Sequence, residues 1–210
     1  WMLTEYYPSG ICFETMTASP RSQLSGLEPP DPYEFVQGFL AAQQILERAG
    51  VDCVLSTAMT ATCQTSFCPV GQDAMIVSPG GQVDACYWME EEWLKRGLDL
   101  RMGSVKDILL GLDPLAVQRA RDLTDQNKQP CEYCFCKYHC AGGCHVRRAS
   151  SPTARREAEV CIQTRLITTA RLLQRLNNQD VLDNMLQDQP SLERLAYQQD
   201  DRLVQPGYLL

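Results

Sequence analysis

In one segment near the beginning of the chain, hydrophobic side chains recur at the spacing of a single helical face. Asp31 stands at the N-cap position of this helix, and Gly50 ends the pattern. Short apolar runs at 11–15 and 51–55 flank the helix and predict strands. Residues 11–56 are therefore predicted to form a strand, a helix and a second strand of a parallel α/β layer.

The middle of the chain carries shorter signals. A Gly-Gly turn between two apolar runs predicts a β-hairpin over residues 75–85. Two capping signals predict a short helix over residues 104–110 and a longer one over residues 113–125. Residues 131–144 are predicted to be a cysteine-rich loop.

The last third of the chain is predicted to be mainly helical. A long helix is expected over residues 153–177, with leucines on one face and arginines elsewhere. Two short helices are predicted to begin near Asp180 and Ser191, and residues 198–210 have no clear period and are expected to form a mobile tail.

Composition places the chain among ordinary globular proteins, with 210 residues that are 44% hydrophobic and 21% charged. Nineteen Lys and Arg against 26 Asp and Glu give a net charge of −7, which argues against a nucleic-acid partner. No apolar stretch approaches the roughly 20 residues that cross a bilayer, and the first residues lack a signal-sequence pattern. We therefore expect a cytoplasmic protein without a membrane partner.

Cysteine is the exception, because 11 of the residues are cysteines, an odd number that argues against a closed set of disulfides. The spacing C-x2-C-x5-C-x3-C is formed by Cys131, Cys134, Cys140 and Cys144, and Cys161 follows in the predicted long helix. The upstream cysteines are Cys63, Cys68 and Cys86, the last two in the order C-x12-G-x4-C with Gly81 as the glycine. Eight candidate metal ligands result.

The chemistry of these cysteines favours metal binding. Thiolates bind soft metals, and a C-x2-C loop lets two sulfurs converge on one centre. Gly142 and Gly143 allow the backbone to approach inorganic sulfide without a Cβ clash. By spacing alone, two iron–sulfur clusters and two structural zinc sites are equally good interpretations. Cys12 and Cys53 are predicted to be buried free thiols, and Cys136 has no assigned role.

The cysteine order resembles the seven-cysteine pattern of the SPASM domain, the C-terminal extension of many radical S-adenosylmethionine (AdoMet) enzymes. The resemblance covers Cys68 to Cys161, and the hairpin sequence from Ile76 to Cys86 is also similar to that family's. It implies two auxiliary 4Fe-4S clusters with crossed ligation. The first set would be Cys63, Cys68, Cys86 and Cys144, and the second Cys131, Cys134, Cys140 and Cys161.

Residues 11–56 are likewise similar to the last strand-helix-strand part of the radical AdoMet barrel. The resemblance implies an α/β fold in which residues 1–57 end a partial (β/α) barrel. Residues 58–178 would form an irregular α+β SPASM domain, and residues 179–210 a helical or mobile tail. The C-x3-C-x2-C motif that binds the AdoMet cluster is absent from this sequence. The AdoMet-binding half is therefore expected elsewhere, on another chain, or lost, and this chain alone is expected to be inactive.

Tyr87 and Asp84, beside the hairpin cysteine Cys86, are candidates for proton transfer. In the sulfatase-maturing branch of the family an aspartate directly after this cysteine is thought to act as a base, so Tyr87 speaks against formylglycine formation. Tyr87 is instead expected to pack over the cluster loop with Trp88 and Trp93. Asp84 is expected to be a hairpin carboxylate that faces water.

Two histidines and a run of arginines accompany the later cysteines. His139 and His145 flank assigned ligands, but eight thiolates leave no vacancy, so His145 is expected to be a hydrogen-bond donor. Seven arginines against two glutamates between residues 145 and 176 give a local charge of 7 − 2 = +5. A solvated helix face is the expected explanation. The alternatives are compensation of cluster charge and docking of an acidic peptide.

The resemblance implies an oxidoreductase function, as the auxiliary-cluster half of a radical AdoMet enzyme that matures a ribosomally made peptide. Oxidative crosslinking of side chains is the expected chemistry, with an auxiliary cluster accepting the surplus electron, and dehydrogenation of a small alcohol or sugar is the family's other branch. A different class of function is a non-catalytic zinc or iron–sulfur module that binds a partner or delivers electrons. A truncated chain that does not fold stably is a third hypothesis.

Overall fold

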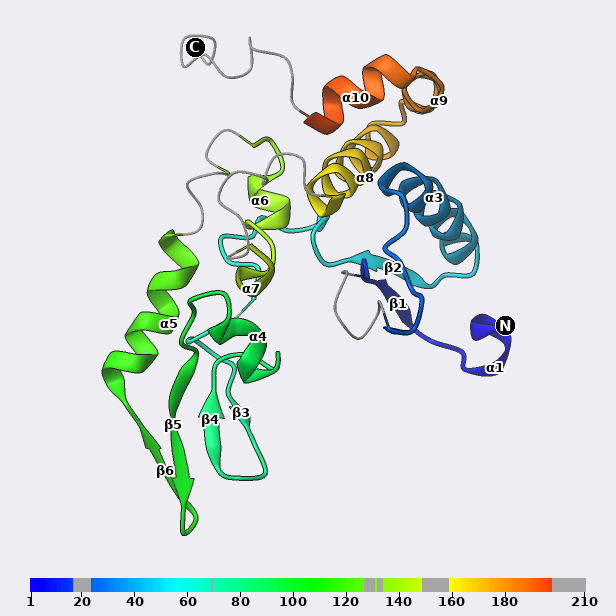
Figure 1. Ribbon diagram of the computed structural model, residues 1–210. Coiled ribbons are helices and arrows are strands. Elements are labelled where there is room, and N and C mark those ends of the chain that lie inside the picture. The colour runs from blue at the N-terminus through cyan, green and yellow to red at the C-terminus, as the bar shows by residue number, and fades with distance from the viewer. Residues whose placement is uncertain (17–23, 69, 127–130, 132–133, 149–158, 198–210) are drawn as a thin grey trace, which may run out of the picture. The chain divides into compact units, whose positions relative to one another are not determined.

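The computed structural model describes residues 1–16, 24–68, 70–126, 131, 134–148 and 159–197, and combines helices with two small β-sheets (Figure 1). The chain divides into two compact units. The first consists of Trp1–Gln64, Tyr133–Cys140 and Arg156–Leu210, and the second of Thr65–Glu132 and Ala141–Arg155. Each unit has a hydrophobic core of its own. Because the chain contains both helices and sheets, the fold is a mixed α and β structure, as expected.

The first unit opens with short helix α1 (Met2–Glu5) and a pair of parallel strands. Strand β1 (Gly10–Phe13) pairs with β2 (Asp52–Leu55) over its whole length, and helix α3 (Pro32–Arg48) connects the two. The predicted strand-helix-strand unit is confirmed.

Helix α3 begins at its predicted cap. Asp31 Oδ1 accepts hydrogen bonds from the backbone amides of Tyr33 at 2.9 Å and Glu34 at 3.1 Å, which satisfies two of the free donors of the first turn. On the apolar face, the ring of Phe39 meets the ring of Phe13 edge-on, with centroids 5.5 Å apart. This contact packs helix α3 against strand β1.

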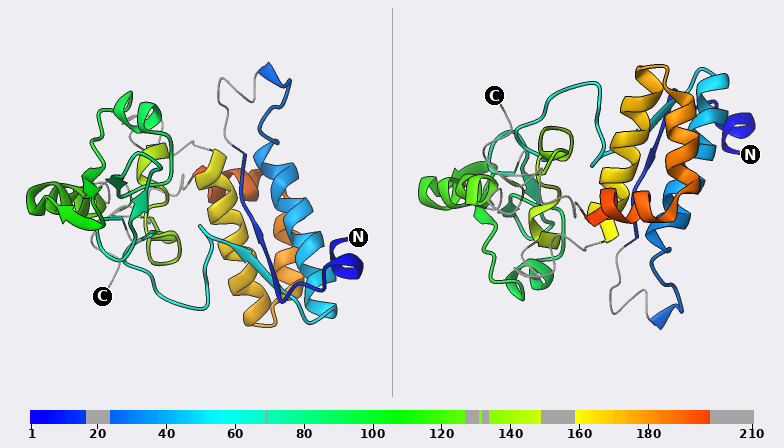
Figure 2. Two further views of the ribbon diagram at one scale, coloured as in Figure 1. Left: turned by 90° about the horizontal axis from the view of Figure 1, so that it is seen from below. Right: turned by 90° about the horizontal axis from the view of Figure 1, so that it is seen from above.

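Helix α8 (Glu159–Arg175) is the centre of the first unit, and every residue from 162 to 168 is buried. Helix α3 packs beside it, and α9 (Gln179–Gln187) and α10 (Gln189–Tyr197) close the core, as Figure 2 shows. A helix buried on so many sides must accommodate its polar residues inside the protein.

These helices confirm much of the prediction for the last third of the chain. The helices expected near Asp180 and Ser191 are present as α9 and α10. Residues 153–158 of the predicted long helix and the predicted tail at 198–210 lie outside the described residues. The helix ends at Arg175, so Leu176 is 74% exposed and does not belong to the apolar face as predicted.

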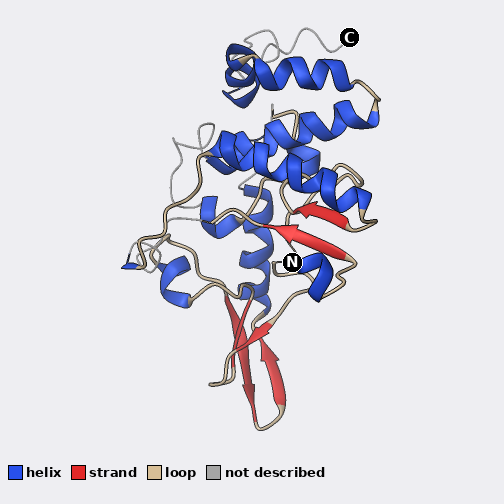
Figure 3. Cartoon of the chain, turned by 90° about the vertical axis from the view of Figure 1, so that its right-hand side faces the viewer, coloured by secondary structure: helices blue, strands red, loops and turns tan. Residues whose placement is uncertain are grey.

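The second unit is built on an antiparallel sheet with the strand order β3-β4-β5-β6 (Figure 3). Strands β3 (Ile76–Val77) and β4 (Gln82–Asp84) form the predicted hairpin. Helix α5 (Pro114–Gln126) confirms the prediction for residues 113–125 and packs against β5 (Arg101–Lys106). Short helices α4 (Glu90–Leu94) and α7 (His145–Arg148) of this unit were not predicted, nor was α6 (Lys137–Cys140) of the first unit.

The short helix predicted over residues 104–110 is wrong, because this segment forms the hairpin of β5 and β6 (Leu109–Leu112). The two turn residues, Asp107 and Ile108, both have positive φ, of 48° and 67°. The pattern failed because a short apolar run fits a strand as well as a helix. Gly103 is compatible with the close pairing of this hairpin, since a Cβ atom there would clash with the carbonyl oxygen of Gly111 across the hairpin.

The expected domain boundaries, which put residues 58–178 in one cysteine-rich domain, stay a prediction. In the structure, helix α8 packs with α3 in the core of the first unit, because a helix joins the core that covers its apolar face. Among the described helices, none is long and apolar enough to cross a membrane.

Substitution of two glycines tests this account of the hairpin. Gly103→Ala should lower the free energy of unfolding by about 1–3 kcal/mol, because the new methyl group meets backbone that cannot move aside. Gly38→Ala, in α3 with open space around it, should raise that free energy by about 0.5–1 kcal/mol. Urea unfolding followed by circular dichroism measures both, and a neutral Gly103→Ala would contradict the close approach of β5 and β6.

Candidate metal centre

Gly81 positions the hairpin that carries Cys86. Its φ of +81° is in the region that glycine favours, and a Cβ atom would lie 2.6 Å from the carbonyl oxygen of Val105. The Gly81 carbonyl in turn accepts a hydrogen bond from the Val105 amide at 2.6 Å. The glycine of the C-x12-G-x4-C spacing is therefore needed because β5 passes directly over the turn.

Three cysteines from separate segments meet in the second unit. Cys68, Cys86 and Cys144 are half-buried and pack against the same core, which includes Val83, Ala85 and Val146. Their thiols are close enough for Cys144 to raise the pKa of both Cys68 and Cys86. The structure thus brings together three of the four cysteines predicted for the first cluster.

Backbone amides point at two of these sulfurs. The Trp88 amide donates to Cys86 Sγ at 3.5 Å, and the Val70 amide donates to the Cys68 thiol. Burial raises the pKa of both thiols, and the amides partly offset that effect. Amide donors aimed at sulfur stabilise a thiolate, as a bound metal centre requires.

The loop that precedes Cys144 has an unusual backbone. Ala141, Gly142 and Gly143 all have positive φ, of 47°, 87° and 71°. The φ values of Gly142 and Gly143 are in the region that glycine favours. Ala141 adopts the same region at a cost of about 1 kcal/mol, so the surrounding structure holds the loop in this conformation.

Aromatic and cationic side chains hold the segments of Cys86 and Cys144 together. Trp88, two residues after Cys86, has two guanidinium groups over its ring, with Arg96 at 5.8 Å and Arg147 at 6.0 Å from the ring centroid. Arg147 follows Cys144 by three residues, so its contact with Trp88 links the two ligand-bearing segments.

A second group of thiols lies in the first unit. Cys134 and Cys136 are hydrogen-bonded through their side chains, and Cys140 lies close enough to Cys136 to raise its pKa further. Burial is the main cause of the raised pKa of Cys136, which is 1% exposed and whose Sγ lies 4.0 Å from the carbonyl oxygen of Thr164. The hydrogen bond from Cys136 lowers the pKa of Cys134.

Arginines from α8 turn inward, contrary to the prediction of a solvated face. Arg165 is 4% exposed and is hydrogen-bonded to the side chain of Cys134. Arg171 is half-buried and donates to the carbonyl oxygens of Cys53 at 2.5 Å and Ala58 at 2.8 Å. Arg175 donates to the carbonyl oxygen of Thr60 at 2.6 Å, so Arg165, Arg171 and Arg175 each hold the backbone or a candidate ligand. Arg155 and Arg156 lie outside the described residues.

The remaining assigned cysteines are placed separately. Cys161 is half-buried in the first turn of α8, four residues before Arg165. Cys63 is exposed in the first unit, and Cys131 is half-buried in the second.

Several side chains near the candidate ligands differ from the prediction. Tyr87 is 80% exposed and does not pack over the loop, whereas Trp93 is fully buried and donates to the Trp88 carbonyl at 3.1 Å. Asp84 is half-buried, and its pKa is raised by burial. Cys12 is exposed, not buried as predicted, because it lies on the uncovered side of β1.

Cys53 and the two histidines are the remaining side chains that the sequence singles out. Cys53 is half-buried and lies against the first core. His145 is 4% exposed, in the short helix that follows Cys144. His139 donates from Nδ1 to the carbonyl oxygen of Met59 at 3.1 Å, a contact that fixes the orientation of its ring.

The donor set suits an iron–sulfur cluster in chemistry. Among the described residues, no three His, Cys, Asp or Glu side chains lie together as the ligands of one metal ion would. Sulfurs around a single zinc stand about 3.8 Å apart, given Zn–S bonds of about 2.3 Å in a tetrahedron. Cluster ligands bind separate irons and stand further apart. Half-buried thiols on one core, with amide donors at two of them, are suitable donors for a thiolate-bound metal centre.

Comparisons with known proteins add no relative, because no family model, curated protein or solved structure matches the chain. The candidate centre therefore rests on the cysteines and their surroundings.

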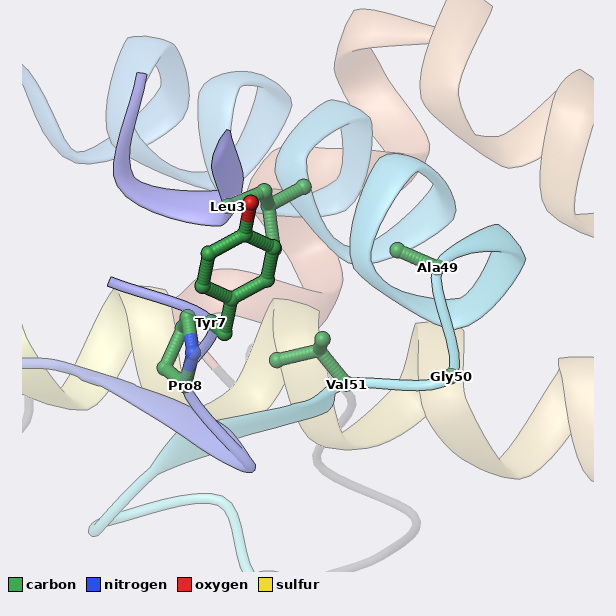
Figure 4. A pocket seen from close by; sticks show the side chains of 6 residues that line it. All are labelled: Leu3, Tyr7, Pro8, Ala49, Gly50 and Val51. Atoms are coloured by element: carbon green, nitrogen blue, oxygen red, sulfur yellow. The ribbon is translucent and has the colours of Figure 1, made fainter. Parts of the chain in front are cut away.

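A shallow hollow in the first unit is not part of this centre. Figure 4 shows it between the N-terminal segment and the turn that joins α3 to β2. Its lining residues are Leu3, Tyr7, Pro8, Ala49, Gly50 and Val51. None of them is a cysteine or carries a charge, so the hollow offers no metal ligand.

Alkylation of the reduced, metal-free chain tests the burial of the thiols. At pH 8, iodoacetamide should modify exposed Cys63 several-fold faster than Cys68 and Cys86, because the latter are half-buried and their raised pKa values reduce the thiolate fraction. Mass spectrometry of proteolytic fragments over time gives the three rates. Equal rates would show that Cys68 and Cys86 do not pack as described.

Proposed function

We propose that this chain is the auxiliary-cluster portion of a radical AdoMet enzyme and binds two 4Fe-4S clusters. Cys63, Cys68, Cys86 and Cys144 would hold the first, and Cys131, Cys134, Cys140 and Cys161 the second. The AdoMet-binding half would belong to another part or another chain of the enzyme, and this chain alone would be inactive. The proposed setting is the cytoplasm, with no nucleic-acid partner.

The grouping of Cys68, Cys86 and Cys144 is the observation that carries this proposal. In sequence, Cys144 belongs to the run that begins at Cys131, only four positions after Cys140. In the structure it lies with cysteines 58 and 76 residues upstream (144 − 86 and 144 − 68). Crossed ligation requires this grouping, and a zinc site built from the C-x2-C-x5-C-x3-C run alone does not.

The second group gives weaker support of the same kind. Cys134 and Cys140 lie with Cys136 in the first unit, and Arg165 reaches Cys134 from the helix turn that follows Cys161. Two of the assigned ligands are thus near each other, and a third lies on the helix that contacts them.

The proposed reaction is the radical oxidation of a ribosomally made peptide, such as a crosslink between side chains. Clusters of this kind supply one-electron chemistry and take up the electron that remains when a side chain is oxidised. The chain's own residues position the thiols and aim amides at them, and the first group packs on the core that contains Val83 and contacts Trp88.

Metal analysis of the chain purified without oxygen tests the proposal. We expect about eight irons and about eight sulfides per chain, with a broad charge-transfer absorption in the visible spectrum. Cys86→Ala should lose about half of the iron, because it removes one ligand of the first cluster only. Cys12→Ala is the matched control, since this exposed thiol has no assigned partner in either set, and its iron content should equal that of the wild type.

Zinc in place of iron would be an equally clear result. About two zincs per chain without sulfide would refute the proposal and assign the cysteines to a structural metal module. Iron lost equally from Cys12→Ala and Cys86→Ala would show that the assigned ligand sets are wrong.

A further inference from the structure

Strand β6 forms one edge of the four-stranded sheet, and no described strand pairs with its outer side (Figure 1). All four of its residues are exposed. Three of them are leucines, with exposed fractions of 74% at Leu109, 50% at Leu110 and 40% at Leu112. An apolar edge strand without a charge is a template for a further strand, and proteins normally protect such an edge with lysine, proline or a covering element.

The backbone of β6 has hydrogen-bonding groups left for a further strand. The Asp113 amide donates to the Met102 carbonyl oxygen at 2.8 Å, and hydrogen-bonded and non-hydrogen-bonded pairs alternate along an antiparallel ladder. Leu110 and Leu112 therefore direct their backbone N–H and C=O groups away from β5. Within the described part of the chain, no hydrogen bond uses these outward groups.

The side chains of β6 are complementary to a second copy of the strand. When two copies pair antiparallel about a twofold axis at Gly111, Leu110 of each copy lies opposite Leu112 of the other, and these pairs use the outward backbone groups. The four leucines then lie on one face of the joined sheets. Within each copy Leu110 also lies opposite Val105, which packs against the second core, so the apolar strip connects the two cores.

Charges on the opposite face favour the same register. Lys106 of β5 is paired with Leu109, and Leu109 would lie opposite Asp113 of the second copy. Exposed Lys106 and exposed Asp113 would then stand in one cross-strand row, about 10 Å apart at the backbone, where opposite charges attract at low salt. The twofold axis produces this row twice. A register shifted by one step of the ladder replaces the aspartate with Gly111 or Leu115.

The geometry points to a homodimer in which the β6 strands of two copies pair antiparallel about Gly111 and join the two sheets into one. This inference goes beyond the proposed function and does not depend on it, because the contact uses no cysteine and no cluster. Strand β3, at the other edge of the sheet, has only two residues and offers a shorter ladder. The paired surface is small, so the association should be weak, with a dissociation constant in the micromolar range.

Sedimentation velocity of the full chain tests this pairing over about 1–200 µM, the range in which a small interface associates. The chain is purified without oxygen and kept reduced, so that no disulfide joins two copies. Leu110→Lys should weaken the dimer by about tenfold or more, because lysine on an edge strand opposes pairing. Leu176→Lys is the matched control, since this leucine is 74% exposed in the first unit, and it should leave the equilibrium unchanged.

Two further measurements test the register. Lys106→Glu should weaken the dimer several-fold at low salt, because it puts two carboxylates in each row, and adding Asp113→Asn should recover most of that loss. Asparagine keeps the side-chain oxygen that caps α5. In hydrogen exchange, the amides of Leu110 and Leu112 should slow as the concentration of the chain rises, whereas the amide of Gly111, which faces β5, should not change.

A monomer at every concentration would overturn the inference, whether or not the chain binds iron. Association that persists in Leu110→Lys would also overturn it, because the contact would then lie elsewhere. Slow exchange at Leu110 and Leu112 in a chain that stays monomeric would show that another segment of the same chain covers the edge, which again contradicts the dimer. The proposed function fails separately, by an absence of iron and sulfide in the wild-type chain.

Discussion

The burial of α8 is the constraint on which the first unit depends. Because residues 162–168 are all inside, the polar ones must find partners within the protein. Gln163 accepts a hydrogen bond from Thr15, after β1, and Thr164 donates to Thr57, after β2. Helix α8 is thereby hydrogen-bonded to the segments that follow both strands. Arg171 of the same helix also donates hydrogen bonds to the carbonyl oxygens of Cys53 and Ala58. The same burial turns Arg165 toward Cys134.

In the second unit, the main constraint is the close approach of backbone segments at two glycines. Gly81 allows β5 to cross the first hairpin, and Gly103 allows β6 to approach β5. The sheet built in this way buries Val83 and Ala85 and leaves the half-buried thiol of Cys86 at its end. Cys68 and Cys144 pack on the same core, so a region with little regular structure still presents three sulfurs together.

Both groups of thiols have an arginine about one helical turn after a candidate ligand. Arg147 follows Cys144 by three residues and lies over Trp88, and Arg165 follows Cys161 by four and meets Cys134. In each case the arginine joins a segment that carries one ligand to a segment that carries another. The positive charge of the region between residues 145 and 176 is thus partly used inside the protein, in a chain that is acidic as a whole.

The sequence by itself determined the elements whose signals are local: the Asp31 cap of α3, the Gly-Gly turn of the first hairpin, and the cysteine spacing that named the candidate ligands. These signals act within a few residues of the chain, and at these positions the tertiary packing agrees with them. Only the tertiary structure decided that residues 101–112 form a hairpin, that Arg165 faces a sulfur, and that Cys144 lies with Cys68 and Cys86. Such contacts join residues far apart in the chain, and they depend on which surfaces fit together when the cores form.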